Sequence, residues 1–423
     1  MRELDKVIGY DGIKREMDRI LDVLRNPEQY TILGVHVPKG ILLYGEPGIG
    51  KSLLARCFMA ESQRPFYIIR KNKSDGEFVD HIRKVFREAA ENTPSMILLD
   101  DLDKFANADS NHRNAEEYVT VQACIDEVRD KEVFVIATVN NIRSLPGSFK
   151  RSGRFDKTFR MSFPKGKTAV KIISYYLSKK KVCETVDAEE IARFCSGWNC
   201  ADMETVINAA GIHAGYEGKS LIGREDLIYA CLRKHFNNPV DDTVVSVDEL
   251  KNRVVHEAGH AVISEILKPG SVNFIAVSET AGSVDGITST QNSEQFSFTD
   301  METDIMVSLG GKAAVEIVLN EIDMGSFMDI SSAFDTTRLL LDNHTAYDFH
   351  SWCHGKETST HIYDRLDGAT GAEMARYYRK TKKLLNDNRA FMDEIISELL
   401  KKKMLSYKDI KSIREKHRVK QCA

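Results

Sequence analysis

One phosphate-binding pattern constrains the fold of this chain more than any other feature: Gly45-Glu46-Pro47-Gly48-Ile49-Gly50-Lys51-Ser52. It matches G-x-x-x-x-G-K-[ST], follows the apolar run Ile41–Tyr44 and precedes the helical pattern SLLARCFMA. Such a loop works between a buried strand and a helix N-terminus, where backbone N–H groups surround phosphates. The sequence therefore predicts an α/β domain that binds ATP, in which Lys51 reaches the β- and γ-phosphates and Ser52 binds Mg²⁺.

Three further apolar runs predict the rest of a parallel sheet: Phe66–Ile69, Met96–Leu99 and Val133–Ala137. Helical patterns separate these runs, and strands that alternate with helices are typical of parallel α/β domains. The run Met96–Leu99 is followed by Asp100 and Asp101. Beside a phosphate-binding loop, we expect Asp100 to hold Mg²⁺ and Asp101 to orient the attacking water.

A second motif lies far along the chain in an apolar helical run: His256-Glu257-Ala258-Gly259-His260. Histidines four residues apart project from one face of a helix and can hold one Zn²⁺. Glu257 lies beside them and can take a proton from water whose pKa the metal lowers to about 7. A catalytic zinc site needs a third protein ligand. Spacing alone leaves five candidates open: Asp323, Asp329, Asp335, His344 and His350.

Length and composition limit the classes of protein to consider. A chain of 423 residues predicts roughly two to four domains. The formal net charge of -4 gives no support for nucleic-acid binding as the main activity. Eight scattered cysteines without a CxxC pair favour a reducing compartment. The longest apolar runs are far shorter than the roughly 20 residues that cross a bilayer, so we expect a soluble, cytoplasmic chain without a membrane segment.

The pattern along the chain predicts four segments. Residues 1–164 are predicted to form an α/β nucleotide-binding domain, and residues 165–238 to form helices only. Residues 239–246 are polar and turn-rich, which is typical of a linker. Residues 247–423 are mostly helical, with a pair of strands expected at Phe274–Val277 and Gly286–Ser289.

Several segments of the first half resemble the AAA+ module of the FtsH family: VIGYDGIKREMDRILDVLRNPEQY, GEPGIGKS, and VFVIATVNN followed by GSFKRSGRFD. The resemblance implies that Asn140 senses the γ-phosphate and that Arg151 and Arg154 are the candidate arginine fingers. Such a guanidinium stabilises charge on the phosphoryl group of a neighbouring subunit's ATP. A ring, typically a homo-hexamer, is therefore also implied.

The second half is similar to the FtsH peptidase domain in the order HEAGHAVISEIL, GSVDGIT and SLGGKAAVEIVLNEIDMGSFMD. The resemblance implies that Asp329 closes the zinc site beside His256 and His260. The implied fold is an α/β P-loop AAA+ domain with a helical lid, followed by a mostly α-helical HExxH zinc peptidase domain. The implied function is an ATP-dependent zinc metalloprotease, with Zn²⁺, ATP and Mg²⁺ as cofactors, that delivers polypeptide substrates to its proteolytic site.

The sequence departs from the family pattern in ways that leave two other functions open. The resemblance does not extend to a membrane-spanning N-terminal region. Asp101 stands where the family usually has Glu, and Phe78 is the only aromatic candidate for the loop that grips substrate in the pore of the ring. One alternative is a remodelling ATPase with a vestigial or regulatory peptidase domain. The other is a metallopeptidase whose ATPase domain is only a nucleotide-dependent scaffold.

Overall fold

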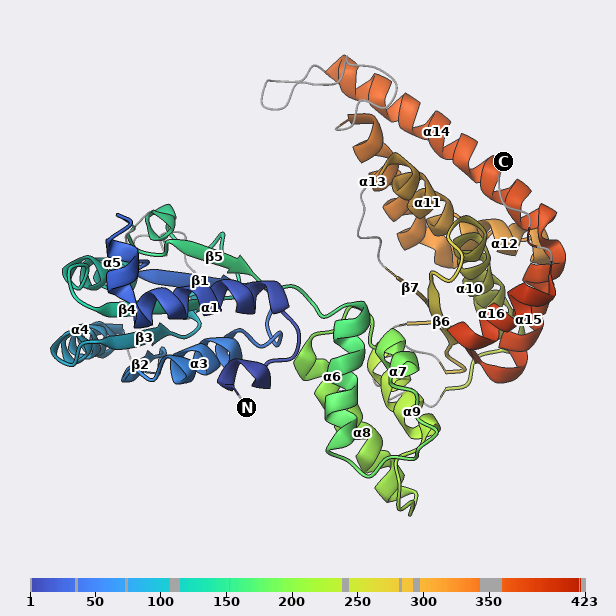
Figure 1. The fold of residues 1–423 in the computed structure, drawn as a ribbon. Helices are drawn as coiled ribbons and strands as arrows, with labels where there is room; N and C mark the ends of the chain where they lie inside the picture. Colours follow the sequence, from blue (N-terminus) through green and yellow to red (C-terminus); the bar gives the residue numbers. More distant parts are fainter. Residues whose placement is uncertain are drawn as a thin grey trace. The chain divides into compact units, whose positions relative to one another are not determined.

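A computed structural model describes residues 2–417 and 419, except 35–36, 73–74, 107–114, 152, 238–242, 281–283, 292–296 and 343–359. These residues divide into two compact units, one of residues 1–180 with 197–208 and one of residues 181–196 with 209–423 (Figure 1). The boundary between the units passes through the predicted helical segment 165–238. The division of the chain into 1–164, 165–238, 239–246 and 247–423 therefore stays a prediction, and most of its linker lies outside the described residues.

The first unit is built on a parallel sheet with the strand order β2-β3-β4-β1-β5. The strands are β1 (Gly40–Tyr44), β2 (Phe66–Ile69), β3 (Ser95–Leu99), β4 (Val133–Val139) and β5 (Lys157–Arg160). The four strands predicted from apolar runs are confirmed. The edge strand β5 was not predicted, because three of its four residues are polar or charged and it has no apolar run.

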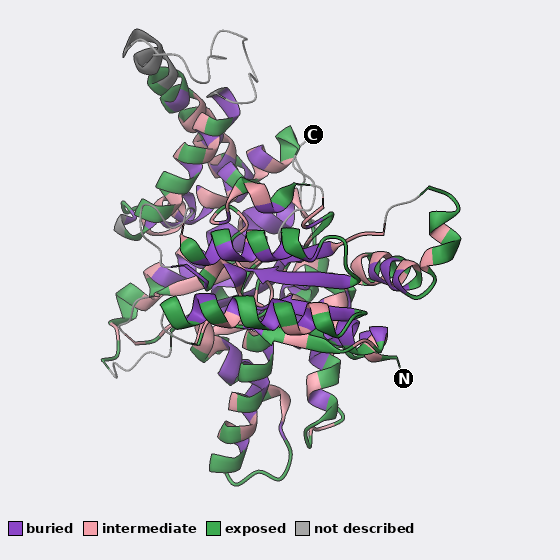
Figure 2. Cartoon of the chain, turned by 90° about the vertical axis from the view of Figure 1, so that its left-hand side faces the viewer, coloured by how far each residue is buried: buried purple, intermediate pink, exposed green. Residues whose placement is uncertain are grey.

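Helices cover both faces of this sheet. The covering helices are α1 (Asp11–Arg25) and α3 (Lys51–Ser62) on one face, and α4 (Asp75–Glu91) and α5 (Glu116–Glu127) on the other. Successive side chains of a strand point to opposite faces, so Ile41 and Leu43 of β1 join the core under α1 and α3, and Leu42 joins the other core. The central strands β1, β3 and β4 are mostly buried, and Figure 2 shows helices with exposed outer faces. The shorter elements of this unit are η1 (Glu3–Lys6), α2 (Pro27–Thr31), η2 (Leu102–Lys104) and η4 (Gly147–Lys150).

The segment predicted to be helical does form helices, but the two units share it. Its helices are α6 (Gly166–Ser178), α7 (Ala188–Phe194), α8 (Cys200–Tyr216) and α9 (Arg224–His235). Helix α6 and the first half of α8 belong to the first unit. Helices α7 and α9 belong to the second unit, where Phe194 of α7 stacks on Phe274 with ring centroids 4.6 Å apart.

The second unit is organised around one buried helix, α10 (Val247–Leu267). Ser246 begins this helix by accepting a hydrogen bond from the backbone N–H of Glu249, which satisfies one of the otherwise unpaired donors of the first turn. The apolar residues of α10 form one core with those of the surrounding helices. These helices are α11 (Phe298–Ser308), α12 (Gly310–Leu319), α13 (Phe327–Asp342), α14 (Thr360–Asp387), α15 (Arg389–Lys402) and α16 (Tyr407–Lys416), with a short 3-10 helix, η5 (Met324–Ser326), before α13.

A small antiparallel sheet packs beside α10 in the order β7-β6-β8. Its strands are β6 (Val272–Val277), β7 (Gly286–Thr290) and β8 (Met404–Ser406). The predicted pair at 274–277 and 286–289 is confirmed, whereas the three-residue β8 is too short to leave a sequence pattern. In the part of the chain that the structure describes, we find no helix with the length and apolar character that a membrane-spanning segment needs.

Candidate functional site

The phosphate-binding pattern forms a tight loop between β1 and α3. Gly45, Gly48 and Gly50 have φ angles of 149°, 75° and 96°. Glycine adopts such angles without steric cost because it has no Cβ. The loop lines a cavity of about 550 Å³, together with residues that include Asp101 and Asn140. The sequence-predicted loop and two of the more distant predicted residues therefore meet at one cavity.

Lys51 lies at the bottom of this loop and is 5% exposed. Its ammonium group donates to the carbonyl oxygens of Gly45 and Glu46, each at 2.7 Å, and to Oδ1 of Asn140 at 2.8 Å. Burial lowers the pKa of Lys51, because it removes water from the charged form. The structure thus places Asn140 directly beside Lys51.

Ser52 and Asp100 form a compact oxygen cluster beside the loop. The Ser52 hydroxyl donates to Oδ1 of Asp100 at 2.6 Å, and the Thr138 hydroxyl donates to the same oxygen at 2.8 Å. Hydroxyl and carboxylate oxygens are the ligands that Mg²⁺ prefers. The two predicted Mg²⁺ residues are therefore adjacent, and Thr138 of β4 holds the carboxylate in place.

Asp101 lies next to this cluster, but two cations hold its carboxylate. Its Oδ2 is 2.9 Å from Nζ of Lys104 and 3.6 Å from Nη2 of Arg70. Its backbone has a φ of 57°, and its N–H donates to the Thr138 hydroxyl at 2.8 Å. Asp101 is thus at the cavity as predicted, in ion pairs that the sequence did not predict.

A third acid in the same segment supports the loop that carries Asn140. Oδ2 of Asp103 accepts hydrogen bonds from the backbone N–H groups of Asn140 and Asn141, both at 3.1 Å. These bonds fix the chain where β4 ends. Sequence reasoning missed this role, although the spacing of Asp100, Asp101 and Asp103 was a visible signal.

The two candidate arginine fingers differ in their surroundings. Arg154 forms a two-pronged ion pair with Asp126, with Nη2–Oδ2 and Nε–Oδ1 distances of 2.7 and 3.1 Å. Arg151 is exposed. Neither arginine is among the described residues that line the nucleotide cavity of the same chain. The geometry therefore leaves Arg151 more accessible to another molecule than Arg154.

Phe78 does not occupy an exposed loop. It lies in α4, is completely buried, and packs edge-on against Phe105 with ring centroids 4.9 Å apart. The interpretation of Phe78 as the gripping aromatic of a pore loop is therefore wrong, because the helical period turns this side chain into the core.

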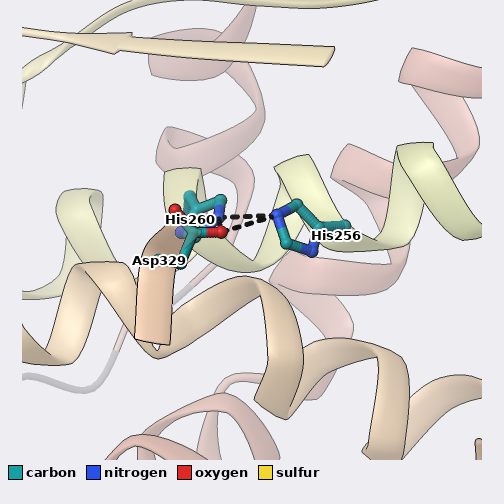
Figure 3. A group of neighbouring side chains, drawn as sticks. All are labelled: His256, His260 and Asp329. Carbon is teal, nitrogen blue, oxygen red and sulfur yellow. Dashed lines mark hydrogen bonds and ion pairs between the residues drawn. The ribbon is translucent and has the colours of Figure 1, made fainter. Parts of the chain in front are cut away.

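The HExxH pattern places two imidazoles one helical turn apart on α10. The Nε2 atoms of His256 and His260 are 2.9 Å apart, and Oδ2 of Asp329 on α13 lies 3.1 and 3.3 Å from them (Figure 3). Zinc bonds of about 2.0–2.1 Å in tetrahedral geometry place ligand atoms roughly 3.3 Å apart. Among the described residues, this is the group of His, Cys, Asp and Glu side chains whose ligand atoms are close enough to share a metal ion.

The second nitrogen of each imidazole is held by an acceptor. Nδ1 of His256 is 2.5 Å from Oδ2 of Asp323, and Nδ1 of His260 is 2.6 Å from the carbonyl oxygen of Val307. Each Nδ1 therefore carries the hydrogen, and both Nε2 lone pairs point toward the Asp329 carboxylate. Three acceptor atoms this close repel one another unless a cation lies between them. The residues present fit a zinc ion.

The charges of the site support the same conclusion. Burial opposes a charged imidazole, but the carboxylates of Asp323 and Asp329 outweigh it and raise the pKa of His256 to about 10. Burial also opposes the charged form of Asp329, yet the neighbouring imidazoles of His256 and His260 hold its pKa below the usual range. The pocket therefore favours positive charge between these groups, and a metal cation can replace the proton.

Glu257 lies beside the metal-binding group and faces β7. The Thr288 hydroxyl lies 2.6 Å from Oε2 of Glu257 and 3.0 Å from its backbone carbonyl oxygen. A Cβ at Gly286 would lie 2.6 Å from Oε1, so β7 approaches closely only because this residue is glycine. Burial raises the pKa of Glu257. These residues line a second cavity, of about 500 Å³.

Close packing of α12 against α10 fixes the metal-binding helix. A Cβ at Gly259 would lie 2.3 Å from the carbonyl oxygen of Gly310, so the two backbones are in direct contact. A Cβ at Gly311 would lie 2.6 Å from Cε1 of His256. Glycine at these positions lets α12 confine the imidazole.

The structure also separates the five candidates for the third ligand. Asp329 joins the two histidines, whereas Asp323 binds the outer nitrogen of His256. Asp335 is exposed on α13, and His344 and His350 lie outside the described residues. Sequence reasoning missed Thr288 and the orienting role of Asp323, because both contacts depend on tertiary packing.

Comparison with known proteins covers both halves of the chain. Residues 41–163 match the family described as "ATPase family associated with various cellular activities (AAA)". The chain is 28% identical over 433 residues to "ATP-dependent zinc metalloprotease FtsH 2" of Phytoplasma mali (strain AT), covering 96% of this chain and 62% of the relative.

Two other relatives show the same level of similarity. The chain is 29% identical over 443 residues to "ATP-dependent zinc metalloprotease FtsH" of Leptotrichia buccalis, covering 97% and 57% of the two sequences. It is 28% identical over 431 residues to "ATP-dependent zinc metalloprotease FtsH 2" of Thermoanaerobacter sp. (strain X514), covering 97% and 82%. The chain thus spans less than two thirds of the length of the relatives from Phytoplasma and Leptotrichia.

Proposed function

Because the chain belongs to the FtsH family, we propose that it is an ATP-dependent zinc metalloprotease, which hydrolyses ATP and delivers polypeptides to its own proteolytic site. One observation carries this proposal. Two imidazole nitrogens and one carboxylate oxygen converge within 3.3 Å of one another, beside a buried glutamate, in a chain that also has a phosphate-binding loop.

His256, His260 and Asp329 would hold the zinc ion, and three protein ligands leave a fourth position open, as catalysis requires. When bound, zinc supplies Lewis acidity, which polarises a peptide carbonyl and makes water a stronger acid. Asp323 and the Val307 carbonyl hold the outer imidazole nitrogens, which keeps both Nε2 lone pairs directed inward.

Glu257 acts as the general base. Thr288 binds Oε2, which assigns the proton transfer to Oε1. This oxygen accepts a proton from the attacking water and then returns it to the nitrogen of the leaving amine. Burial favours the protonated form, so the carboxyl group can hold the proton between the two transfers.

The nucleotide site would bind ATP with Mg²⁺. Lys51 neutralises the phosphates, Ser52 and Asp100 hold the Mg²⁺, and Asn140 senses the γ-phosphate. Asp101 orients the attacking water after its ion pairs with Lys104 and Arg70 have rearranged. Mg²⁺ supplies the positive charge that stabilises the transferred phosphoryl group.

The proposed assembly is supported by the position of the two arginines. Arg151 and Arg154 do not line the described nucleotide cavity of their own chain, so we assign them to the ATP of a neighbouring subunit in a ring, typically a homo-hexamer. The substrate is a polypeptide that the ring passes to the zinc site. We assign the helices of 165–238 to the lid of the ATPase and the residues from 247 onward to the peptidase domain.

A second function is favoured by one observation. The carboxylate of Asp101 is paired with two cations, and its side chain is one methylene shorter than Glu. A chain that could not activate water would bind ATP without hydrolysing it, and its ATPase domain would act as a scaffold for the peptidase. Steady-state ATP turnover distinguishes the two functions.

The test measures degradation of an unfolded, casein-type protein by the full chain, with and without ATP. We expect ATP-dependent degradation that a zinc chelator abolishes and added zinc restores. The Glu257→Gln chain serves as the matched control, because it keeps the three metal-binding side chains. Degradation that survives chelation, or that persists in this control, would contradict the proposed site. Absence of bound zinc in the purified chain would favour a remodelling ATPase with a vestigial peptidase domain.

A further inference from the structure

Arg253 lies in α10, one helical turn before Glu257, and is 8% exposed. Its Nη1 donates to the carbonyl oxygens of Ser278 and Thr280, at 3.0 and 3.1 Å. Its Nη2 lies 2.6 Å from Oε1 of Glu249 and 2.7 Å from Oδ1 of Asp285. The four hydrogens of the two Nη atoms therefore have four protein acceptors, whereas the buried Nε–H has no partner among the described residues.

Three of these four acceptors belong to one hairpin. Ser278 and Thr280 follow β6, and Asp285 precedes β7. Arg253 therefore ties the residues just after β6 and just before β7 to α10. Among the described strands, β7 pairs with β6 alone. The segment after β6 is also held by a hydrogen bond from the backbone N–H of Val245 to the carbonyl oxygen of Glu279, at 3.0 Å.

The strand held in this way carries the contacts of the catalytic base. Thr288, three residues after Asp285, binds the Glu257 carboxylate, and Gly286 packs against the same side chain. Residues four apart on a helix share one face. Arg253 and Glu257 therefore lie next to each other on the face of α10 that contacts β7. A shift of the hairpin would move Thr288 relative to Glu257.

We propose that Arg253 is a positioning residue for the general base: by holding the β6–β7 hairpin on α10, it fixes Thr288 and Gly286 against Glu257. The proposal deepens the proposed function and rests on it in one respect, namely that Glu257 acts as the base. Among the described residues, the polar contacts of Arg253 are to Glu249, Ser278, Thr280 and Asp285, and none is to a metal-binding atom.

The experiment compares Arg253→Gln and Arg253→Lys in the full chain with ATP. We expect kcat for peptide cleavage to fall roughly tenfold or more in Arg253→Gln, since a positioned base contributes about 10²–10⁴ in rate. KM and zinc content should stay at the wild-type values. Arg253→Lys keeps the charge but loses the fork geometry, so it should recover part of the activity. Arg389→Gln is the matched control, because Arg389 forms an exposed ion pair with Asp393 in α15 of the same unit.

Two further readouts separate positioning from a general loss of structure. Hydrogen exchange should become faster for the backbone amides of residues 286–290 and stay unchanged in α12. Adding Thr288→Val to Arg253→Gln should lower kcat little beyond the worse single change, because both changes act through one contact.

Three results would each overturn the role proposed for Arg253. A rise in KM with an unchanged kcat would overturn the proposal in favour of substrate binding, and loss of zinc in both Arg253 variants would overturn it in favour of a global structural role. Unchanged exchange in 286–290 would also overturn it. This last readout does not need activity: if the wild-type chain cleaves no peptide, the proposed function fails, while hydrogen exchange still decides whether Arg253 holds the hairpin.

Discussion

Replacing Asp323 with Asn should weaken zinc binding about 10- to 100-fold, the usual cost of removing an outer partner of a metal-binding imidazole. The Asp323 side chain is 2% exposed, and its two oxygens serve two donors. Oδ2 lies 2.5 Å from Nδ1 of His256, and Oδ1 accepts from the backbone N–H of Gly325 at 2.9 Å.

An amide cannot serve both donors. If its oxygen faces His256, its NH₂ group meets the N–H of Gly325, and two donors oppose each other. If its NH₂ group faces His256, Nδ1 must become the acceptor and Nε2 must carry the hydrogen, which removes the lone pair that binds metal. Either orientation loses a hydrogen bond to a charged group, worth about 1.5–3 kcal/mol. That loss corresponds to roughly a 10- to 100-fold change in affinity.

The assay is a competition titration of the purified chain against a chelator of known zinc affinity at fixed pH. Asp335→Asn is the matched control, because it makes the same change in charge at an exposed position on α13. Asp329→Ala should lose more affinity than Asp323→Asn, since it removes a ligand rather than a ligand's partner. If Asp323→Asn bound zinc as tightly as the Asp335→Asn control, the orienting role of this carboxylate would be refuted.

Four other results are expected. Lys51→Ala should abolish tight ATP binding, measured with a fluorescent nucleotide, because the phosphates lose their buried cation; unchanged affinity would contradict the assignment of the loop. Glu257→Gln should keep zinc but lose roughly 10²–10⁴ in peptidase rate; metal analysis beside peptide turnover checks this, and joint loss of both would indicate a structural role. Arg151→Ala should bind ATP but hydrolyse it slowly, and mixing it with Lys51→Ala chains should restore some turnover. Arg154→Ala should lower the rate of ATP hydrolysis less than Arg151→Ala, because Arg154 is held by Asp126. Full ATPase activity in a monomeric fraction would rule out arginine fingers that act between subunits. The chain should degrade unfolded proteins with ATP yet stall on a folded domain whose free energy of unfolding is about 5–15 kcal/mol. The reason is that Phe78 is buried and cannot grip the substrate polypeptide. Equal degradation rates for the two substrates would show that another residue grips the substrate.

Local sequence patterns were enough to predict much of the fold. Buried strands such as β3 and β4 are continuous apolar runs, because both faces of a parallel sheet are covered by helices. The pattern fails for strands that are mostly polar or very short. β5 has one apolar residue, Phe159, among three polar or charged ones, and β8 has three residues, so neither differs from a loop in the sequence.

The residues of the candidate sites also fall into two groups: those that a local sequence pattern predicts, and those that only tertiary packing brings together. His256 and His260 are four residues apart on one helix, so their convergence follows from helical geometry alone. Asp329 is 69 residues beyond His260 and reaches it only through the packing of α13, which is why spacing left five candidates. Thr288 could not be predicted at all, since threonine in a strand is common and only tertiary structure places it on Glu257.

The contact between Gly259 and Gly310 has a consequence for protein engineering. The motif HExxH leaves its two middle positions unspecified. Here the second of them touches the backbone of a neighbouring helix, and the next glycine, Gly311, touches the His256 ring. A graft that copied the five motif residues would leave the imidazoles free to rotate. A successful transplant must carry the glycine pair of α12 and the Asp329 of α13 as well, so the smallest portable form of this metal site is three helices rather than one.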